Sequence, residues 1–200
     1  MLNNKPILNV VSRRAPNFRD KLFNQKQIGL NITLGSPTIR CTNIGSRGRG
    51  RPCMSCELMS NKSELTINNK PLKCMGGNCK TNNLIYCAQC DICSLSYFGK
   101  SVQMFSTRIS QHRNPIISKS FNPNEIDDEN TLAAHAYLVH NARTKSDFNS
   151  LYKFSIVRIL DPFNLTKGEQ YFINLFNTRW PGGLNVDNPI NLPATFDFNI

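Results

Sequence analysis

Apolar and polar positions between residues 83 and 98 predict a β-hairpin. Two short apolar runs, NLIY and LSYF, flank the polar segment Cys90–Ser94. Runs of this length that are rich in aromatic and branched residues are typical of strands, and the segment between them is expected to form the turn. After the second run, apolar residues recur at helical spacing from Ser101, which is the expected N-cap. This stretch therefore predicts a hairpin that leads into a helix.

The remaining periodicity predicts further elements on either side of this hairpin. Residues 65–72 suggest a small hairpin with Asn68 and Asn69 at its turn, and residues 114–128 suggest a loop. The later elements are a helix over 129–142, a strand over 152–160 that ends at Asp161-Pro162, and an amphipathic helix over 167–178. The order strand, strand, helix, helix, strand, helix indicates a small α/β (α+β) domain with a largely antiparallel sheet.

Composition divides the chain into four regions. Residues 1–40 are expected to be a basic arm or linker, residues 41–82 a loop-rich module with cysteines, and residues 83–186 the domain with the sheet. Residues 187–200 are rich in Asn and Pro and are expected to form an irregular tail.

Charge is unevenly distributed, and this points to a polyanionic partner. Residues 1–120 contain 18 Lys and Arg against 4 Asp and Glu, whereas residues 121–200 contain 6 against 9. The run SRGRGRP places Arg47, Arg49 and Arg51 between glycines. Such a flexible basic segment can follow a phosphate backbone and release its counterions. A polyanion such as a nucleic acid is therefore the expected partner, with Lys100 and Arg113 as further candidate contacts, and an ordinary solvated basic surface is the alternative.

The sequence favours an intracellular protein without a membrane partner. No apolar run reaches the roughly 18 residues of a membrane span, and the N-terminus lacks the apolar region of a signal peptide. Eight cysteines in an intracellular chain suggest metal binding rather than disulfides. Cys53, Cys56, Cys74 and Cys79 are the candidate ligands of a structural zinc ion, with Cys41 as an alternate ligand.

The spacing of residues 84–112 resembles the GIY-YIG endonuclease family. The two tripeptides read LIY and YFG here, and Arg108 follows the second by nine residues. Arg108 and His112 are four residues apart, so they share one face of the expected helix. The resemblance implies a three-stranded sheet flanked by helices. An ordinary hairpin with two half-buried tyrosines is the alternative.

Residues 11–185 look like one branch of this family, the endonuclease domain of Penelope-like retroelements. The supporting features are the C-x-x-C pair between the tripeptides, HAYLVH, and EQYFINLFNTRWPGGLN near the end. The resemblance implies a second structural zinc site formed by Cys90, Cys93, His135 and His140. Cys87 is instead expected to be a buried strand residue.

The resemblance also implies roles in metal-dependent DNA cleavage. Glu169 would bind Mg²⁺ or Mn²⁺, Arg108 would contact the scissile phosphate, and Tyr97 would shape the pocket. Tyr86 would act as a base with a lowered pKa, because an unperturbed tyrosine is a poor base at neutral pH. His112 would position Tyr86 or relay its proton, and Asn185 would close the site.

Other interpretations remain for single residues and for the whole chain. Thr166-Lys167-Gly168-Glu169 fits a capping box, in which Glu169 would only cap a helix. In the retroelement family a nick primes reverse transcription, so a nuclear protein that acts with a reverse transcriptase domain, or within a polyprotein, and with its RNA is expected. The alternatives are a non-catalytic zinc-containing nucleic-acid-binding module and a repair-type nuclease for branched DNA.

Overall fold

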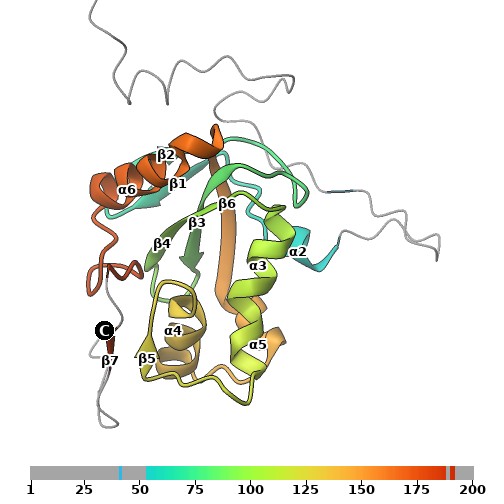
Figure 1. Ribbon diagram of the computed structural model, residues 1–200, viewed down its shortest axis with the longest axis vertical. Helices are drawn as coiled ribbons and strands as arrows, with labels where there is room; N and C mark the ends of the chain where they lie inside the picture. The colour runs from blue at the N-terminus through green and yellow to red at the C-terminus, as the bar shows by residue number, and fades with distance from the viewer. Residues whose placement is uncertain (1–40, 42–52, 188–189, 192–200) are drawn as a thin grey trace, which may run out of the picture.

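A three-stranded antiparallel sheet lies at the centre of the structure. The computed structural model describes residue 41, residues 53–187 and the backbone of residues 190–191 (Figure 1). Strands β3 (Leu84–Cys90), β4 (Ser96–Ser101) and β6 (Tyr152–Ile159) form the sheet in the order β4-β3-β6. Both pairings are antiparallel. The structure therefore confirms the mixed α+β class with small antiparallel sheets and flanking helices.

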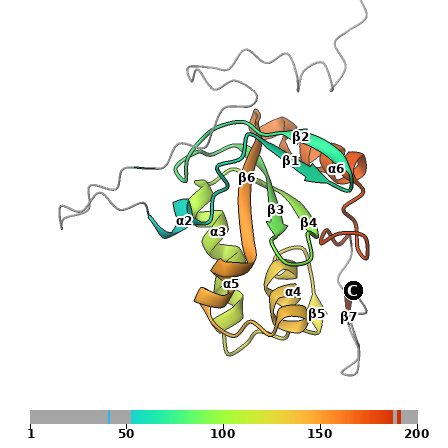
Figure 2. The same ribbon diagram turned by 180° about the vertical axis from the view of Figure 1, so that it is seen from behind.

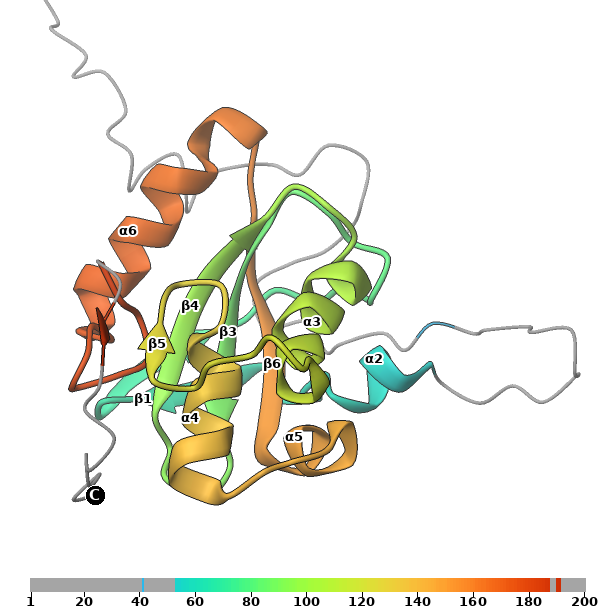
Figure 3. The same ribbon diagram turned by 60° about the horizontal axis from the view of Figure 1, so that its bottom comes forward.

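The alternation of side chains along β3 and β4 builds two separate layers on the sheet. Tyr86 and Tyr97 lie in the core group shared with helices α3 (Phe105–Arg113), α4 (Thr131–His140) and α5 (Lys145–Leu151). Ile85, Cys87 and Phe98 lie in the other core group, shared with helix α6 (Leu165–Phe176). Figure 3 shows α6 on one side of the sheet and α3, α4 and α5 on the other. Cys87 is fully buried, as expected.

A small hairpin, β1 (Glu64–Ile67) and β2 (Lys70–Lys73), packs beside α6 (Figure 2). Its turn residues Asn68 and Asn69 have φ of 46° and 61°, the left-handed conformation that asparagine tolerates better than most residues. Asn68 Nδ2 donates to the Phe176 carbonyl at 2.7 Å and Lys70 Nζ to the Leu175 carbonyl at 2.8 Å. The predicted turn thus satisfies carbonyl groups at the end of α6 that have no partner within the helix.

Several boundaries differ from the sequence prediction. Ser101 is the last residue of β4 rather than a helix cap, and α3 begins at Phe105. Helix α5 was not predicted, although the Thr144 and Asp147 side chains form a capping box at its start. The expected loop 114–128 contains a 3₁₀ helix, η1 (Asn114–Ile117), and strand β5 (Glu125–Ile126).

The shorter elements complete the described structure. Strand β5 pairs with β7 (Ile190–Asn191), which lies inside the expected irregular tail. Helix α2 (Met54–Glu57) precedes the β1–β2 hairpin, and the 3₁₀ helix η2 (Pro162–Asn164) leads into α6. Among the described helices, none combines the length and apolar character needed to cross a membrane.

Candidate functional site

A glycine in β4 sets the position of the first tyrosine. Gly99 lies opposite Tyr86 in the β3–β4 pairing. A Cβ atom at Gly99 would lie 2.5 Å from Tyr86 Cζ and 2.6 Å from Tyr97 Cε1, closer than van der Waals contact allows. Because glycine has no Cβ, the Tyr86 ring can lie over β4 with its hydroxyl group near the edge of the sheet.

The Tyr86 hydroxyl group contacts two side chains of α3. Arg108 Nε donates a hydrogen bond to the Tyr86 oxygen at 3.0 Å, and His112 Nε2 lies 2.5 Å from the same oxygen. Arg108 and His112 are one helical turn apart, so a single face of α3 presents both groups. The structure therefore brings together three of the residues that the sequence pattern singled out.

The ionisation of this group differs from the sequence prediction. Burial raises the pKa of Tyr86, and the nearby Arg108 guanidinium lowers it by less than burial raises it. The expectation of a lowered tyrosine pKa is therefore wrong. Burial, together with repulsion by Arg108, lowers the pKa of His112 to about 3. His112 is neutral at pH 7, and its Nε2 can accept the Tyr86 hydroxyl proton.

The second tyrosine holds an aspartate that the sequence analysis missed. The Tyr97 hydroxyl group donates to Asp128 Oδ1 at 3.0 Å. Asp128 lies in the loop before α4, where no periodic pattern distinguishes it from its neighbours Asp127 and Glu129. Asp128 is exposed, but partial desolvation by the groups around it raises its pKa, and the hydrogen bond from Tyr97 and the charge of Arg108 oppose this shift.

A cavity of about 370 Å³ opens beside these groups. Its lining includes the charged residues Lys100, Arg108, Asp128 and Glu169. Lys100 Nζ lies 2.5 Å from Glu169 Oε2, and Glu169 is only 6% exposed. Residues from β4, α3, α6 and the loop before α4 thus meet at one cavity, with two positive and two negative charges on its wall.

The capping-box interpretation of Glu169 is wrong. Helix α6 begins at Leu165 with Asn164 as its N-cap, so Glu169 lies two residues beyond the N3 position where a capping box needs its carboxylate. Its carboxylate reaches Lys100 on β4 instead. Burial raises the pKa of Glu169, and Lys100 lowers it.

Oxygen-bearing side chains form part of the wall of this cavity. Carboxylates of Glu169 and Asp128 lie on its wall together with the hydroxyl-bearing residues Ser101 and Thr166. Mg²⁺ and Mn²⁺ prefer such oxygen ligands. The Glu169 carboxylate is paired with the ammonium group of Lys100, so a cation bound there would have to displace Lys100.

The four residues of the predicted CCHH site come together below the β3–β4 turn. Cys90 Sγ lies 3.4 Å from His140 Nε2, and Cys93 Sγ lies 3.4 Å from His135 Nε2. The ligand atoms of Cys90, Cys93 and His140 lie within 4.8 Å of one another. His140 is the last residue of α4, before left-handed Asn141, and this position brings it to the cluster despite its spacing from His135.

Tyr152 orients one of these histidines, a role that the sequence did not reveal. Its hydroxyl oxygen lies 2.6 Å from His135 Nδ1 and donates to the Leu132 carbonyl at 3.0 Å. Because the hydroxyl proton goes to Leu132, Tyr152 accepts the proton on His135 Nδ1, and His135 Nε2 is left free for a metal.

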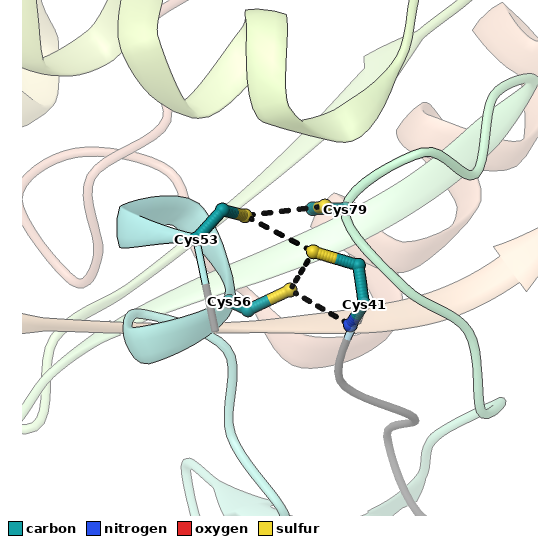
Figure 4. Close-up of side chains that lie close together, drawn as sticks. All are labelled: Cys41, Cys53, Cys56 and Cys79. Carbon is teal, nitrogen blue, oxygen red and sulfur yellow. Dashed lines mark hydrogen bonds between the residues drawn. The ribbon is translucent and has the colours of Figure 1, made fainter. Parts of the chain in front are cut away.

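A second cluster consists of four cysteines (Figure 4). The sulfur atoms of Cys41, Cys53, Cys56 and Cys79 lie within 4.8 Å of one another, with closest separations of 3.3–3.4 Å. A tetrahedral Zn²⁺ ion with Zn–S bonds of 2.3 Å requires sulfur separations of ~3.8 Å. This group could therefore hold a metal such as zinc.

Cys41, rather than Cys74, completes this cluster. Cys74 directly follows β2 and is buried in the core group beneath α6, so the expectation that it binds this metal is wrong. Burial raises the pKa of the Cys41 thiol, but hydrogen bonds from Cys53, Cys56 and Cys79 outweigh this effect and lower it to about 7.

Other candidate residues have structural positions that differ from their expected roles. Arg113 is only 8% exposed and donates to Met54 Sδ at 2.6 Å, so it is not a surface contact for DNA. Asn185 is also buried and bonds the backbone N–H and carbonyl of Phe98, at 3.0 and 2.7 Å, rather than lining the cavity. Arg47, Arg49 and Arg51 lie outside the described residues.

Comparisons with known proteins do not place this chain in a family. Neither protein-family models, curated proteins nor solved structures gave a significant match to it.

Proposed function

We propose that this chain is a metal-dependent DNA endonuclease of the GIY-YIG type, similar to the nuclease domain of Penelope-like retroelements. One observation carries the proposal. The Tyr86 hydroxyl group is held by Arg108 and His112 next to a cavity with Glu169 and Lys100 on its wall. These residue types can supply the proton acceptor, the cationic groups and the metal ligand that hydrolysis of a phosphodiester bond can use.

The cavity suits a phosphate group of DNA. Arg108 and Lys100 supply positive charge from two sides, and both line the cavity. A phosphodiester gains negative charge in the transition state of hydrolysis, and fixed cationic donors stabilise this charge more than that of the ground state. Arg108 would turn from Tyr86 to the phosphate, which would open the tyrosine hydroxyl group to a water molecule.

Proton transfer would pass through Tyr86 to His112. Tyr86 is not a phenolate, because burial raises its pKa. It can nevertheless accept the proton of the attacking water while it gives its own proton to the neutral His112 Nε2 at 2.5 Å. The water oxygen then forms the new bond to phosphorus, and the bond to the leaving oxygen breaks.

Glu169, with Asp128 across the same cavity, would hold Mg²⁺ or Mn²⁺. The bound cation would polarise the phosphate and stabilise the leaving oxygen. Lys100, released from Glu169, would contact the phosphate instead.

In a retroelement, the proposed cut would have a defined role. A nick with a 3′ hydroxyl end primes reverse transcription in the family that the sequence resembles. The partners in this proposal are DNA in the nucleus, and a reverse transcriptase domain with its RNA.

The Tyr86→Phe variant tests the proton transfer. It removes one hydroxyl group and keeps the buried ring, so we expect the chain to fold and bind DNA while cleavage slows by about 10²–10⁴-fold. The measurement is single-turnover cleavage of a labelled duplex, with extension of the 3′ end by a DNA polymerase. Cleavage at the parent rate would contradict the role of Tyr86.

A non-catalytic nucleic-acid-binding module is the second candidate, and a specific observation favours it. Tyr86 and Tyr97 are both 0% exposed, and the Glu169 carboxylate is paired with the Lys100 ammonium group, so neither the tyrosines nor Glu169 is open to a ligand in this structure. This module would bind DNA with the same affinity in the presence and absence of Mg²⁺ and would cut no substrate, including the branched DNA that a repair-type nuclease prefers.

A further inference from the structure

Helix α3 depends on the chain around the four-cysteine cluster for its first hydrogen bonds. Its N-cap, Met104, forms no side-chain cap. Instead, the Phe105 N–H donates to the Thr81 carbonyl at 2.8 Å, and the Ser106 N–H donates to the Cys79 carbonyl at 2.7 Å. A residue of the cluster thus caps the helix that presents Arg108 and His112 to Tyr86.

The other half of the cluster contacts the far end of the same helix. Cys53 is the N-cap of helix α2 and Cys56 lies within the helix, so this segment contributes two of the four thiols (Figure 4). At the last residue of α3, Arg113 Nη1 donates to Met54 Sδ at 2.6 Å. The two segments that supply most of the thiols therefore hold α3 at its two ends.

The segment after α2 is also joined to the sheet behind the tyrosine. The Phe154 N–H donates to the Leu58 carbonyl, and the Ser60 N–H donates to the Phe154 carbonyl, both at 2.8 Å. The Phe154 ring lies 6.3 Å, centroid to centroid, from the rings of Tyr86 and His112. Movement of the α2 segment would therefore also displace Phe154 and, through it, the rings of Tyr86 and His112.

Only hydrogen bonds that involve cysteine sulfur join these segments directly at the cluster in the described structure. All four cysteines are free thiols, so no disulfide links residue 41, α2 and the loop at Cys79. Their sulfur atoms nevertheless converge to nearly the separations of a tetrahedral zinc site. Such a site is closed to substrate because protein ligands fill every position, so its effect on chemistry must be indirect.

We propose that Cys41, Cys53, Cys56 and Cys79 bind zinc and that this zinc site positions α3, so that Arg108 and His112 meet Tyr86. The four cysteines are positioning residues because they act on the site through α3. The backbone carbonyl of Cys79, for example, accepts a hydrogen bond from the first turn of α3. The effect on cleavage rests on the proposed function, whereas the effect on α3 does not.

The test compares two single-thiol variants of the full chain. Cys41→Ser removes one ligand at a residue distant in sequence from both α2 and α3. Cys74→Ser is the matched control, because Cys74 is a buried thiol outside both clusters. Zinc content is measured by mass spectrometry, and we expect two ions per chain in the parent and in Cys74→Ser, and one in Cys41→Ser.

Hydrogen exchange then reports on the helix independently of activity. In Cys41→Ser, the amides of Phe105 and Ser106 should exchange about tenfold faster, while those of β3 keep their protection. Cys41→His, which restores a zinc ligand, should restore the second zinc ion and the slow exchange. In a cleavage assay, kcat should fall at least about tenfold in Cys41→Ser with KM for DNA nearly unchanged.

Three results would overturn the proposal. The first is two zinc ions in Cys41→Ser, and the second is loss of one ion without faster exchange at Phe105 and Ser106. If Cys41→Ser does not fold, Cys41→His replaces it in the test. The third result is then a folded Cys41→His variant that lacks the second zinc ion and still shows slow exchange at Phe105 and Ser106. A parent protein that never cleaves DNA would instead refute the nuclease function, because the zinc and exchange results do not depend on cleavage.

Discussion

Buried His112 should make the stability of this protein depend on pH. Its folded-state pKa is about 3, against about 6.5 in an unfolded chain. Because the folded pKa is the lower one, the unfolded chain binds a proton first as the pH falls. The stability that neutral His112 contributes is therefore fully present above about pH 6.5 and is lost progressively as the pH falls toward 3.

The size of this effect follows from proton linkage. At pH 5, protonation stabilises the unfolded state by about 2 kcal/mol, while the folded protein still holds His112 neutral. The parent should therefore lose about 2 kcal/mol of unfolding free energy through this residue between pH 7.5 and pH 5. The slope is about 1.4 kcal/mol per pH unit once the unfolded histidine is mostly protonated.

Urea unfolding of the parent and of His112→Gln at several pH values measures this contribution. Both proteins keep the same candidate zinc ligands, so any loss of a bound metal at low pH affects both, and the difference between their stabilities isolates His112. That difference should shift by about 2 kcal/mol toward the variant between pH 7.5 and pH 5, with equal denaturant slopes. Parallel stability curves would refute the account of a neutral buried acceptor for the Tyr86 proton.

Two other variants test neighbouring parts of the site. Gly99→Ala places a methyl group against the Tyr86 ring, so it should destabilise the fold by about 1–3 kcal/mol in urea unfolding and abolish cleavage; an active, stable variant would show that the ring can move. Tyr152→Phe removes the partner of His135 Nδ1 and should weaken zinc binding at the CCHH site by about 10–100-fold in a chelator competition assay. Unchanged affinity would exclude that role for Tyr152.

The features predicted correctly from the sequence are those that local physical chemistry determines. Two short apolar runs predicted the β3–β4 hairpin, and Asn68-Asn69 predicted a turn, at which both residues have positive φ. The spacing of Arg108 and His112 placed both on one helical face, and the structure directs that face at Tyr86. Each of these features depends on backbone geometry within a few consecutive residues, so it can be predicted from a single sequence.

The features that were missed depend on contacts between distant segments. Cys41 and Cys74 are equivalent as thiols, and only the docking of β2 under α6 removes Cys74 from the cluster. Arg113 has the sequence signature of a surface residue, but the packing of α2 on α3 buries it. Asp128 has no motif of its own, and Tyr97 brings it to the cavity. The raised pKa of Tyr86 likewise follows from burial that the sequence does not specify.

Cleavage of supercoiled plasmid DNA tests the central claim most directly. The parent and Glu169→Gln are compared in Mg²⁺ and in Mn²⁺, with DNA binding and zinc content measured for both. Glutamine keeps the shape of the side chain but removes the charge that would hold the cation, so we expect the parent to nick the plasmid and the variant to be slower by at least about 100-fold. Equal nicking by both proteins would contradict the role of Glu169. Absence of nicking by a parent that binds DNA and contains both zinc ions would contradict the nuclease function itself.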